Sequence, residues 1–118
     1  MTQVNIKRVY DEPSEQDGYR VLVDRLWPRG MKREYLKHDY RAKEVTPSND
    51  LRKWFHADVE NRWGAFADMY QKELKESDAA KAFIDKIKAY SKVTLLYASK
   101  EQERNHANVL KHYLDTHL

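Results

Sequence analysis

The chain of 118 residues contains no cysteine, which excludes a disulfide framework, a thiol nucleophile and a thiolate metal site. It has only three glycines, and they are not spaced as a phosphate-binding glycine-rich loop requires. No apolar run approaches the ~18 residues of a membrane span, and residues 1–7 lack the apolar segment of a signal peptide. These absences predict a cytoplasmic protein that does not enter a membrane.

What the chain does contain is charge and aromatic side chains. Charged residues make up 35% and apolar residues 41%, so the hydrophobic core must be concentrated in a few segments. Three Trp, eight Tyr and three Phe supply apolar area that a disordered chain lacks. The length fits one domain, which we expect to span residues 1–118. The net charge of +3 permits an anionic partner, nucleic acid included, without indicating one.

Three segments have the composition of β-strands. The first covers residues 4–10, and the second runs from Tyr19 to about Trp27, where Pro28 and Gly30 end it. Residues 93–98 form the most apolar run and are too short for a helix. This third segment is therefore predicted to be a central strand that is buried on both faces.

Helices are expected between and after these strands. A short helix is predicted over residues 32–38, and longer ones begin after capping residues at Thr46, Asp58, Ser77 and Ser99. Ser99 and Gln102 also have the spacing of a capping box. The order of the elements predicts an α/β fold, a small mixed or parallel sheet with helices on both faces.

Polar side chains follow the second and third predicted strands. If these strands run parallel, their carboxyl ends lie at one edge of the sheet, where ligands of open α/β sheets bind. The side chains expected at this edge are Asp24, Arg25, Arg29, Lys100, Arg104, Asn105 and His106. Arginine binds two oxygens at once, and the helix expected after Ser99 would direct its positive end there. A small anionic or phosphate-bearing ligand is therefore predicted, with no cofactor and no metal.

The candidate residues divide into two roles. Asp24 and His106 are the candidates for proton transfer, since histidine titrates near neutral pH. The candidates for binding the substrate are Arg25, Arg29, Lys100, Arg104 and Asn105. Because Asp24 and Arg25 are neighbours in the predicted strand, their side chains should face opposite sides of the sheet. Structural alternatives stay open: an ion pair for Asp24 and Arg25, a cap for Asn105, and a surface residue for His106.

Several stretches of the sequence resemble the YeaO-like family, a branch of domain of unknown function 488. They are residues 20–30 (RVLVDRLWPRG), 47–48, 51–55, 94–98 and 105–107, together with Trp63, Phe66, Tyr70, Glu73 and Leu74. The chain departs from the family at Tyr40, where a tryptophan is expected. The resemblance implies a small bacterial or archaeal cytosolic α/β protein, and it implies no particular reaction.

Two functions remain open at this level, and the first is the one that we predict. The first is an enzyme that acts on a phosphate-bearing substrate, such as a nucleotide or a nucleic-acid end, with an arginine clamp and a proton-transfer residue. The second is a non-catalytic module that binds an anion, a nucleic acid or another protein. They differ in whether Asp24 and His106 must reach the same pocket. The oligomeric state is not indicated.

Overall fold

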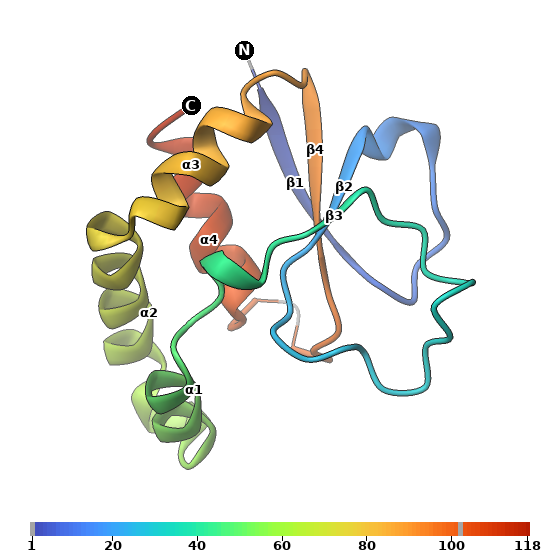
Figure 1. Cartoon of the computed structure of the whole chain (residues 1–118). Coiled ribbons are helices and arrows are strands. Elements are labelled where there is room, and N and C mark those ends of the chain that lie inside the picture. Colours follow the sequence, from blue (N-terminus) through green and yellow to red (C-terminus); the bar gives the residue numbers. More distant parts are fainter. Residues whose placement is uncertain (1, 102) are drawn as a thin grey trace.

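The computed structural model describes residues 2–101 and 103–118. Its strands are β1 (Gln3–Arg8), β2 (Tyr19–Leu22), β3 (Tyr40–Arg41) and β4 (Lys92–Tyr97). Its α-helices are α1 (Asn49–His56), α2 (Val59–Glu76), α3 (Asp78–Ile87) and α4 (His106–Asp115), and two single 3₁₀ turns cover Glu15–Asp17 and Lys43–Val45. The predicted α/β class is confirmed (Figure 1).

The four strands form one parallel sheet in the order β1-β4-β2-β3. The most apolar segment, β4, lies between β1 and β2, and its residues from Val93 to Tyr97 are buried, so the prediction of a central strand is confirmed. The parallel pairing of β2 with β4, in which Val21 lies opposite Leu95, is confirmed as well. All carboxyl ends of the strands therefore lie at the same edge of the sheet.

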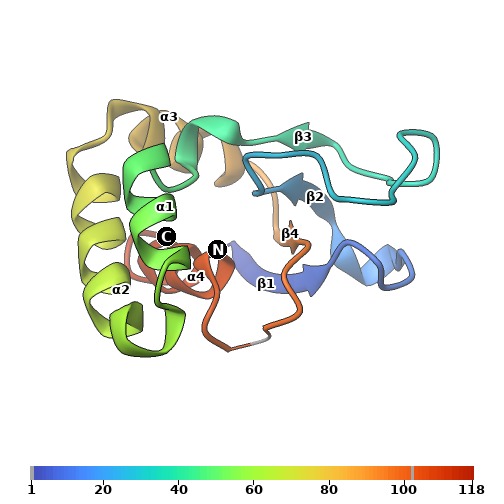
Figure 2. The same cartoon turned by 90° about the horizontal axis from the view of Figure 1, so that it is seen from below.

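The four α-helices cover only one face of the sheet (Figures 1 and 2). On that face Val21, Val93 and Leu95 belong to one buried cluster with apolar residues of every α-helix. On the opposite face Leu22 and Leu96 pack with Leu36 and Val9, and Trp27 and Met31 complete this second cluster. The expectation of helices on both faces is thus wrong in this respect, because an irregular segment, residues 27–39, covers the second face instead.

The same irregular segment changes the predicted second strand and the short helix after it. Strand β2 ends at Leu22, and only the Val23 N–H continues the ladder, to the Leu96 carbonyl at 3.0 Å. Residues 32–38 contain a turn and no helix. Tyr40 and Arg41 form the short edge strand β3, which the sequence did not indicate because a two-residue strand has no apolar alternation. The chain leaves the sheet early because residues 24–26 turn into the edge of the sheet and residues 27–39 cross its second face.

Two of the predicted helix starts are shifted. Ser48, and not Thr46, caps α1 by accepting a hydrogen bond from the Leu51 N–H. Asn105, and not Ser99, caps α4 by accepting from the Asn108 N–H, and the predicted partner of Ser99, Gln102, lies outside the described residues. The caps at Asp58 and Ser77 are at the predicted positions, although the Asp58 side chain makes no capping hydrogen bond. No helix in the described ranges is long and apolar enough to cross a membrane.

Candidate functional site

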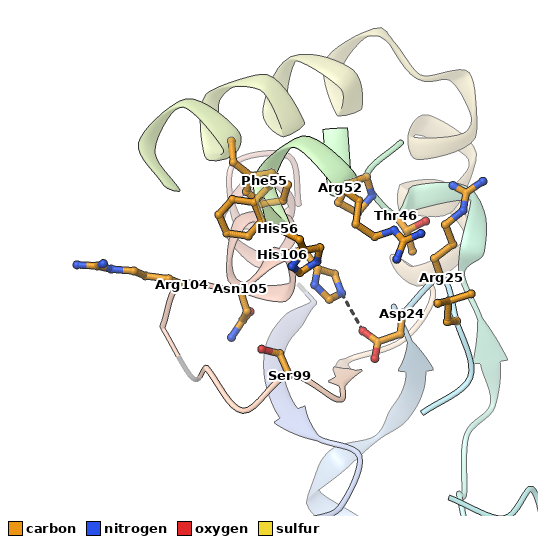
Figure 3. Close-up of a pocket in the computed structure, with 13 residues that line it drawn as sticks. Asp24, Arg25, Thr46, Arg52, Phe55, His56, Ser99, Arg104, Asn105 and His106 are labelled. Carbon is orange, nitrogen blue, oxygen red and sulfur yellow. Dashed lines mark ion pairs between the residues drawn. The ribbon is translucent and has the colours of Figure 1, made fainter. Parts of the chain in front are cut away.

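A pocket of about 220 Å³ lies at the carboxyl ends of β2 and β4 (Figure 3). Three segments that are distant in the sequence line it. Residues after β2 and β4 contribute Asp24, Arg25, Leu26, Ser99, Arg104, Asn105 and His106. The middle of the chain contributes Thr46, Pro47, Arg52, Phe55, His56 and Phe66. The pocket is at the edge of the sheet that the sequence predicted for a ligand.

Asp24 and His106 are in contact at the floor of this pocket. The His106 Nε2 lies 2.9 Å from Asp24 Oδ1 and also 2.9 Å from the Val23 carbonyl oxygen. The other carboxylate oxygen of Asp24 accepts a hydrogen bond from the Ala98 N–H at 2.9 Å. The pair therefore joins the ends of β2 and β4 to the start of α4. Among the described residues, Asp24 Oδ1 is buried with no hydrogen bond beside this ion-pair contact, and the Nδ1 of His106 has no hydrogen-bond partner.

Two arginines supply permanent positive charge to the pocket. Arg25 directly follows Asp24, and Arg52 extends from α1 (Figure 3). Within the described part of the chain, neither guanidinium forms an ion pair, and the Nε of Arg52 is buried without a hydrogen-bond partner. Among the described residues, the Arg52 side chain donates one hydrogen bond, from Nη2 to the Asn49 Oδ1 at 3.2 Å. Of the thirteen lining residues only Asp24 carries a carboxylate, so the pocket is electropositive.

His56 adds a titratable group on the same helix face as Arg52, because residues four apart in an α-helix are neighbours. Partial burial lowers the pKa of His56 below its ordinary value of 6.5, and the charges of Arg52 and His106 lower it further. At neutral pH the uncharged form of the imidazole is therefore favoured. A bound anion would favour the charged form and so oppose this shift.

The walls of the pocket are partly apolar. Phe55 and Phe66 are buried, and their rings stack with centroids 4.1 Å apart. Leu26 and Pro47 also line the pocket, and Leu26 is 64% exposed. The site can therefore accept an anionic group beside an apolar portion of the same molecule.

Asp24 and Arg25 line the same pocket, which contradicts the expectation that they face opposite sides of the sheet. That expectation assumed a strand that continues to Trp27, whereas β2 ends at Leu22 and no strand alternation applies to the residues after it.

Arg29 and Lys100, which were predicted at this site, do not line the pocket. Arg29 is carried to the second face of the sheet by the early end of β2, and its carbonyl accepts a hydrogen bond from the Tyr10 hydroxyl at 2.8 Å. Lys100 is exposed in the bend that follows β4. Neither residue is therefore found beside the other candidates in this pocket, and their role in binding a substrate stays a prediction.

Asn105 and Arg104 also line the pocket, but Asn105 caps α4 and the side chain of Arg104 points away (Figure 3). Asn105 is buried, and its side chain accepts from the Asn108 N–H and donates to the Glu101 carbonyl, both within 2.9 Å. Asn105 therefore has the local capping role that the sequence left open as an alternative to substrate binding. The Arg104 guanidinium points away from the pocket (Figure 3).

The middle segment was missed as a source of site residues. Phe55 and Phe66 match the pattern of core residues, which they also are. The signal that could have revealed the site is the spacing of Arg52 and His56, which puts two basic groups on one face of a short helix. No group of three His, Asp or Glu residues in the described ranges has the geometry to hold a metal ion.

Fold and site together define a small α/β domain with a parallel sheet and an electropositive pocket at the carboxyl ends of its strands. Residues 3–118 match the family model described as "Inactive DUF488-N3 subclade". The chain belongs to this YeaO-like branch of the DUF488 family.

The relatives are bacterial proteins of similar length. The chain is 43% identical over 111 residues to the uncharacterized protein YeaO of Escherichia coli, covering 94% of this chain and 96% of the relative. It is 41% identical over 114 residues to the uncharacterized proteins Mb3100c of Mycobacterium bovis and Rv3073c of Mycobacterium tuberculosis, covering 97% of this chain and 95% of each relative. No solved structure matches the chain.

Proposed function

We propose that this chain is a binding module for a small anionic ligand, which it holds in the pocket at the ends of β2 and β4. The observation that carries the proposal is the charge of the lining. Arg25 and Arg52 have no carboxylate partner in the described ranges, and the single lining carboxylate, Asp24, already contacts His106 and the Ala98 N–H. Unpaired arginines in a partly apolar pocket bind phosphate or carboxylate groups well.

Catalysis is the second candidate, because a histidine beside a carboxylate at 2.9 Å resembles a proton-transfer pair. Two observations favour binding over catalysis. Asp24 Oδ2 and His106 Nε2 are held by the Ala98 N–H and the Val23 carbonyl, so these two atoms serve the fold, whereas Asp24 Oδ1 is buried with only the 2.9 Å ion-pair contact to His106. The matching family model also carries the description of an inactive subclade. The earlier prediction of an enzyme for phosphate-bearing substrates stays a prediction.

The substitution Asp24→Asn tests the sign of the charge effect. In a binding module, removing the one negative charge should strengthen the binding of inorganic phosphate by about fivefold, because a repulsive charge near the anion is lost. Isothermal titration of the wild type and the variant with phosphate, pyrophosphate and a nucleoside monophosphate measures this change. The melting temperature without ligand reports separately on the lost pairing with His106.

Asp68→Asn, on the exposed side of α2, is the matched control and should leave binding unchanged. Binding that weakens in Asp24→Asn contradicts the charge argument. Release of phosphate from the monophosphate by the wild type, lost in Asp24→Asn, would support the enzyme candidate instead.

The pH dependence of binding follows from His56. Its lowered pKa means that it becomes charged only below its ordinary value of 6.5, so anion binding should strengthen as the pH falls through that range. Sulfate is the suitable probe because its own charge is constant there. Its affinity should rise by about threefold or more from about pH 7.5 to about pH 5.5, and His56→Gln should remove part of this rise. An equal rise in His56→Gln would assign the effect to other groups.

A further inference from the structure

The second face of the sheet carries a surface that the anion pocket does not use. Residues 29–41, here called the basic loop, cross this face and end in β3. Leu36 is 4% exposed and packs on Leu22 and Leu96, and the Asp39 N–H donates to the Arg20 carbonyl at 2.7 Å. The loop is therefore anchored to the sheet, and it lies on the opposite side of the molecule from α2 (Figures 1 and 2).

The basic loop is strongly charged, and most of its charges are positive. It contains five basic residues, Arg29, Lys32, Arg33, Lys37 and Arg41, and two acidic ones, Glu34 and Asp39, a net charge of +3 that equals the charge of the entire chain. In the part of the chain that the structure describes, none of the five cations forms an ion pair. The Asp39 carboxylate accepts a hydrogen bond from the Arg20 N–H at 2.9 Å, so it does not neutralise them.

Aromatic rings alternate with these cations. Tyr35 is 67% exposed, and the Lys32 ammonium lies 5.7 Å from the centre of its ring. Tyr10 is 46% exposed beside the loop, with its hydroxyl on the Arg29 carbonyl. The guanidiniums of Arg33 and Arg41 lie 5.2 and 5.5 Å from the Trp27 ring. Large exposed rings on an anchored loop present flat surfaces to a partner without a large loss of entropy on binding.

We propose that the basic loop binds single-stranded nucleic acid, with bases stacked on Tyr35 and with Lys32, Arg33 and Lys37 in contact with the backbone phosphates. Cations in rows with exposed aromatic rings are the combination that proteins use for single strands, because every base has a face that can stack. A duplex offers no such unstacked base, so the exposed tyrosines favour the single strand. The inference does not rest on the anion pocket, which lies at a different place in the fold.

Fluorescence anisotropy with a labelled oligothymidylate of about twelve residues tests the proposal. The double variant Lys32→Ala/Arg33→Ala should weaken binding by about tenfold at low salt, because two phosphate contacts are lost. The slope of log K against log salt should also become shallower by about 1.4, which is about 0.7 for each contact to a single strand. Lys72→Ala/Lys75→Ala on α2 removes the same charge from exposed positions and should change neither quantity.

The ring of Tyr35 provides a second and independent measurement. Tyr35→Leu should weaken binding by about fivefold or more, whereas Tyr35→Phe should retain it, since stacking needs the ring and not the hydroxyl. The proposal is overturned if the oligonucleotide does not bind at about 50 mM salt, or if the α2 control loses as much affinity as the loop variant. A preference for the duplex of the same sequence, or binding to anionic lipid vesicles in place of the oligonucleotide, would also overturn it.

Discussion

Replacing both Arg25 and Arg52 by alanine is expected to weaken sulfate binding by about a hundredfold or more, since each charge-assisted hydrogen bond contributes about 1.5–3 kcal/mol. Both arginines line the pocket, and neither guanidinium has a carboxylate partner in the described ranges. Each single substitution should have a smaller effect, because the remaining arginine can still contact the anion. Isothermal titration with sulfate at neutral pH measures the loss.

The double variant should remain folded. The Arg25 side chain forms no hydrogen bond or ion pair with the described residues, and the Nε of Arg52 is buried without a partner, so its removal relieves an unsatisfied group. The melting temperature should therefore stay close to that of the wild type. Lys53→Ala/Lys72→Ala, which removes two exposed charges from α1 and α2, is the matched control. Unchanged sulfate affinity in the arginine variant would place the anion elsewhere on the protein.

The sequence predicted where this pocket lies because parallel strands place their ends together. The apolar run at residues 93–98 identified the central strand, and Asp24, Arg25 and His106 were expected near its carboxyl end. Those three residues do line one pocket. A long helical connection between two strands strongly favours a parallel direction, and this direction alone places their carboxyl ends together.

The sequence did not predict where the second strand ends, and the error moved Arg29 to the wrong site. Val21 to Val23 are all buried, so the apolar pattern continues past Leu22, the last residue that pairs as β2. Tertiary packing ends the strand: residues 27–39 cross to the second face, where Leu36 and Trp27 pack on Leu22 and Leu96. A local pattern contains no information about that packing partner.

The first residue of α1 was also mispredicted because it depends on a tertiary contact. Both Thr46 and Ser48 are good caps, and Pro47 favoured the first. Ser48 caps the helix because its hydroxyl and N–H also bond the Glu73 carboxylate, at 2.6 and 3.0 Å, from the distant helix α2. This contact sets the position of α1, and with it the positions of Arg52 and His56 at the pocket.

Phe66→Ala is expected to lower the free energy of unfolding by about 3–5 kcal/mol, the usual cost of removing a buried phenylalanine ring. Phe66 is 2% exposed and stacks on Phe55, and its ring centre lies 5.9 Å from those of Trp63 and Tyr70. Urea unfolding measures the loss. Met69→Ala on the same helix removes a side chain that is 47% exposed and should cost about 0.5 kcal/mol or less.

The consequence for the pocket distinguishes Phe66 from an ordinary core residue. Its ring is both part of the helical core and a wall of the anion site, so the cavity left by alanine should open into the pocket. Phe66→Leu retains most of the volume and should cost roughly 1 kcal/mol, with sulfate binding retained because the arginines are untouched. If Phe66→Ala lowers the free energy of unfolding by no more than Met69→Ala does, the Phe66 ring is not tightly packed in the core. Contacts other than the packing of α1 on α2 would then have to hold Arg52 and His56 at the pocket.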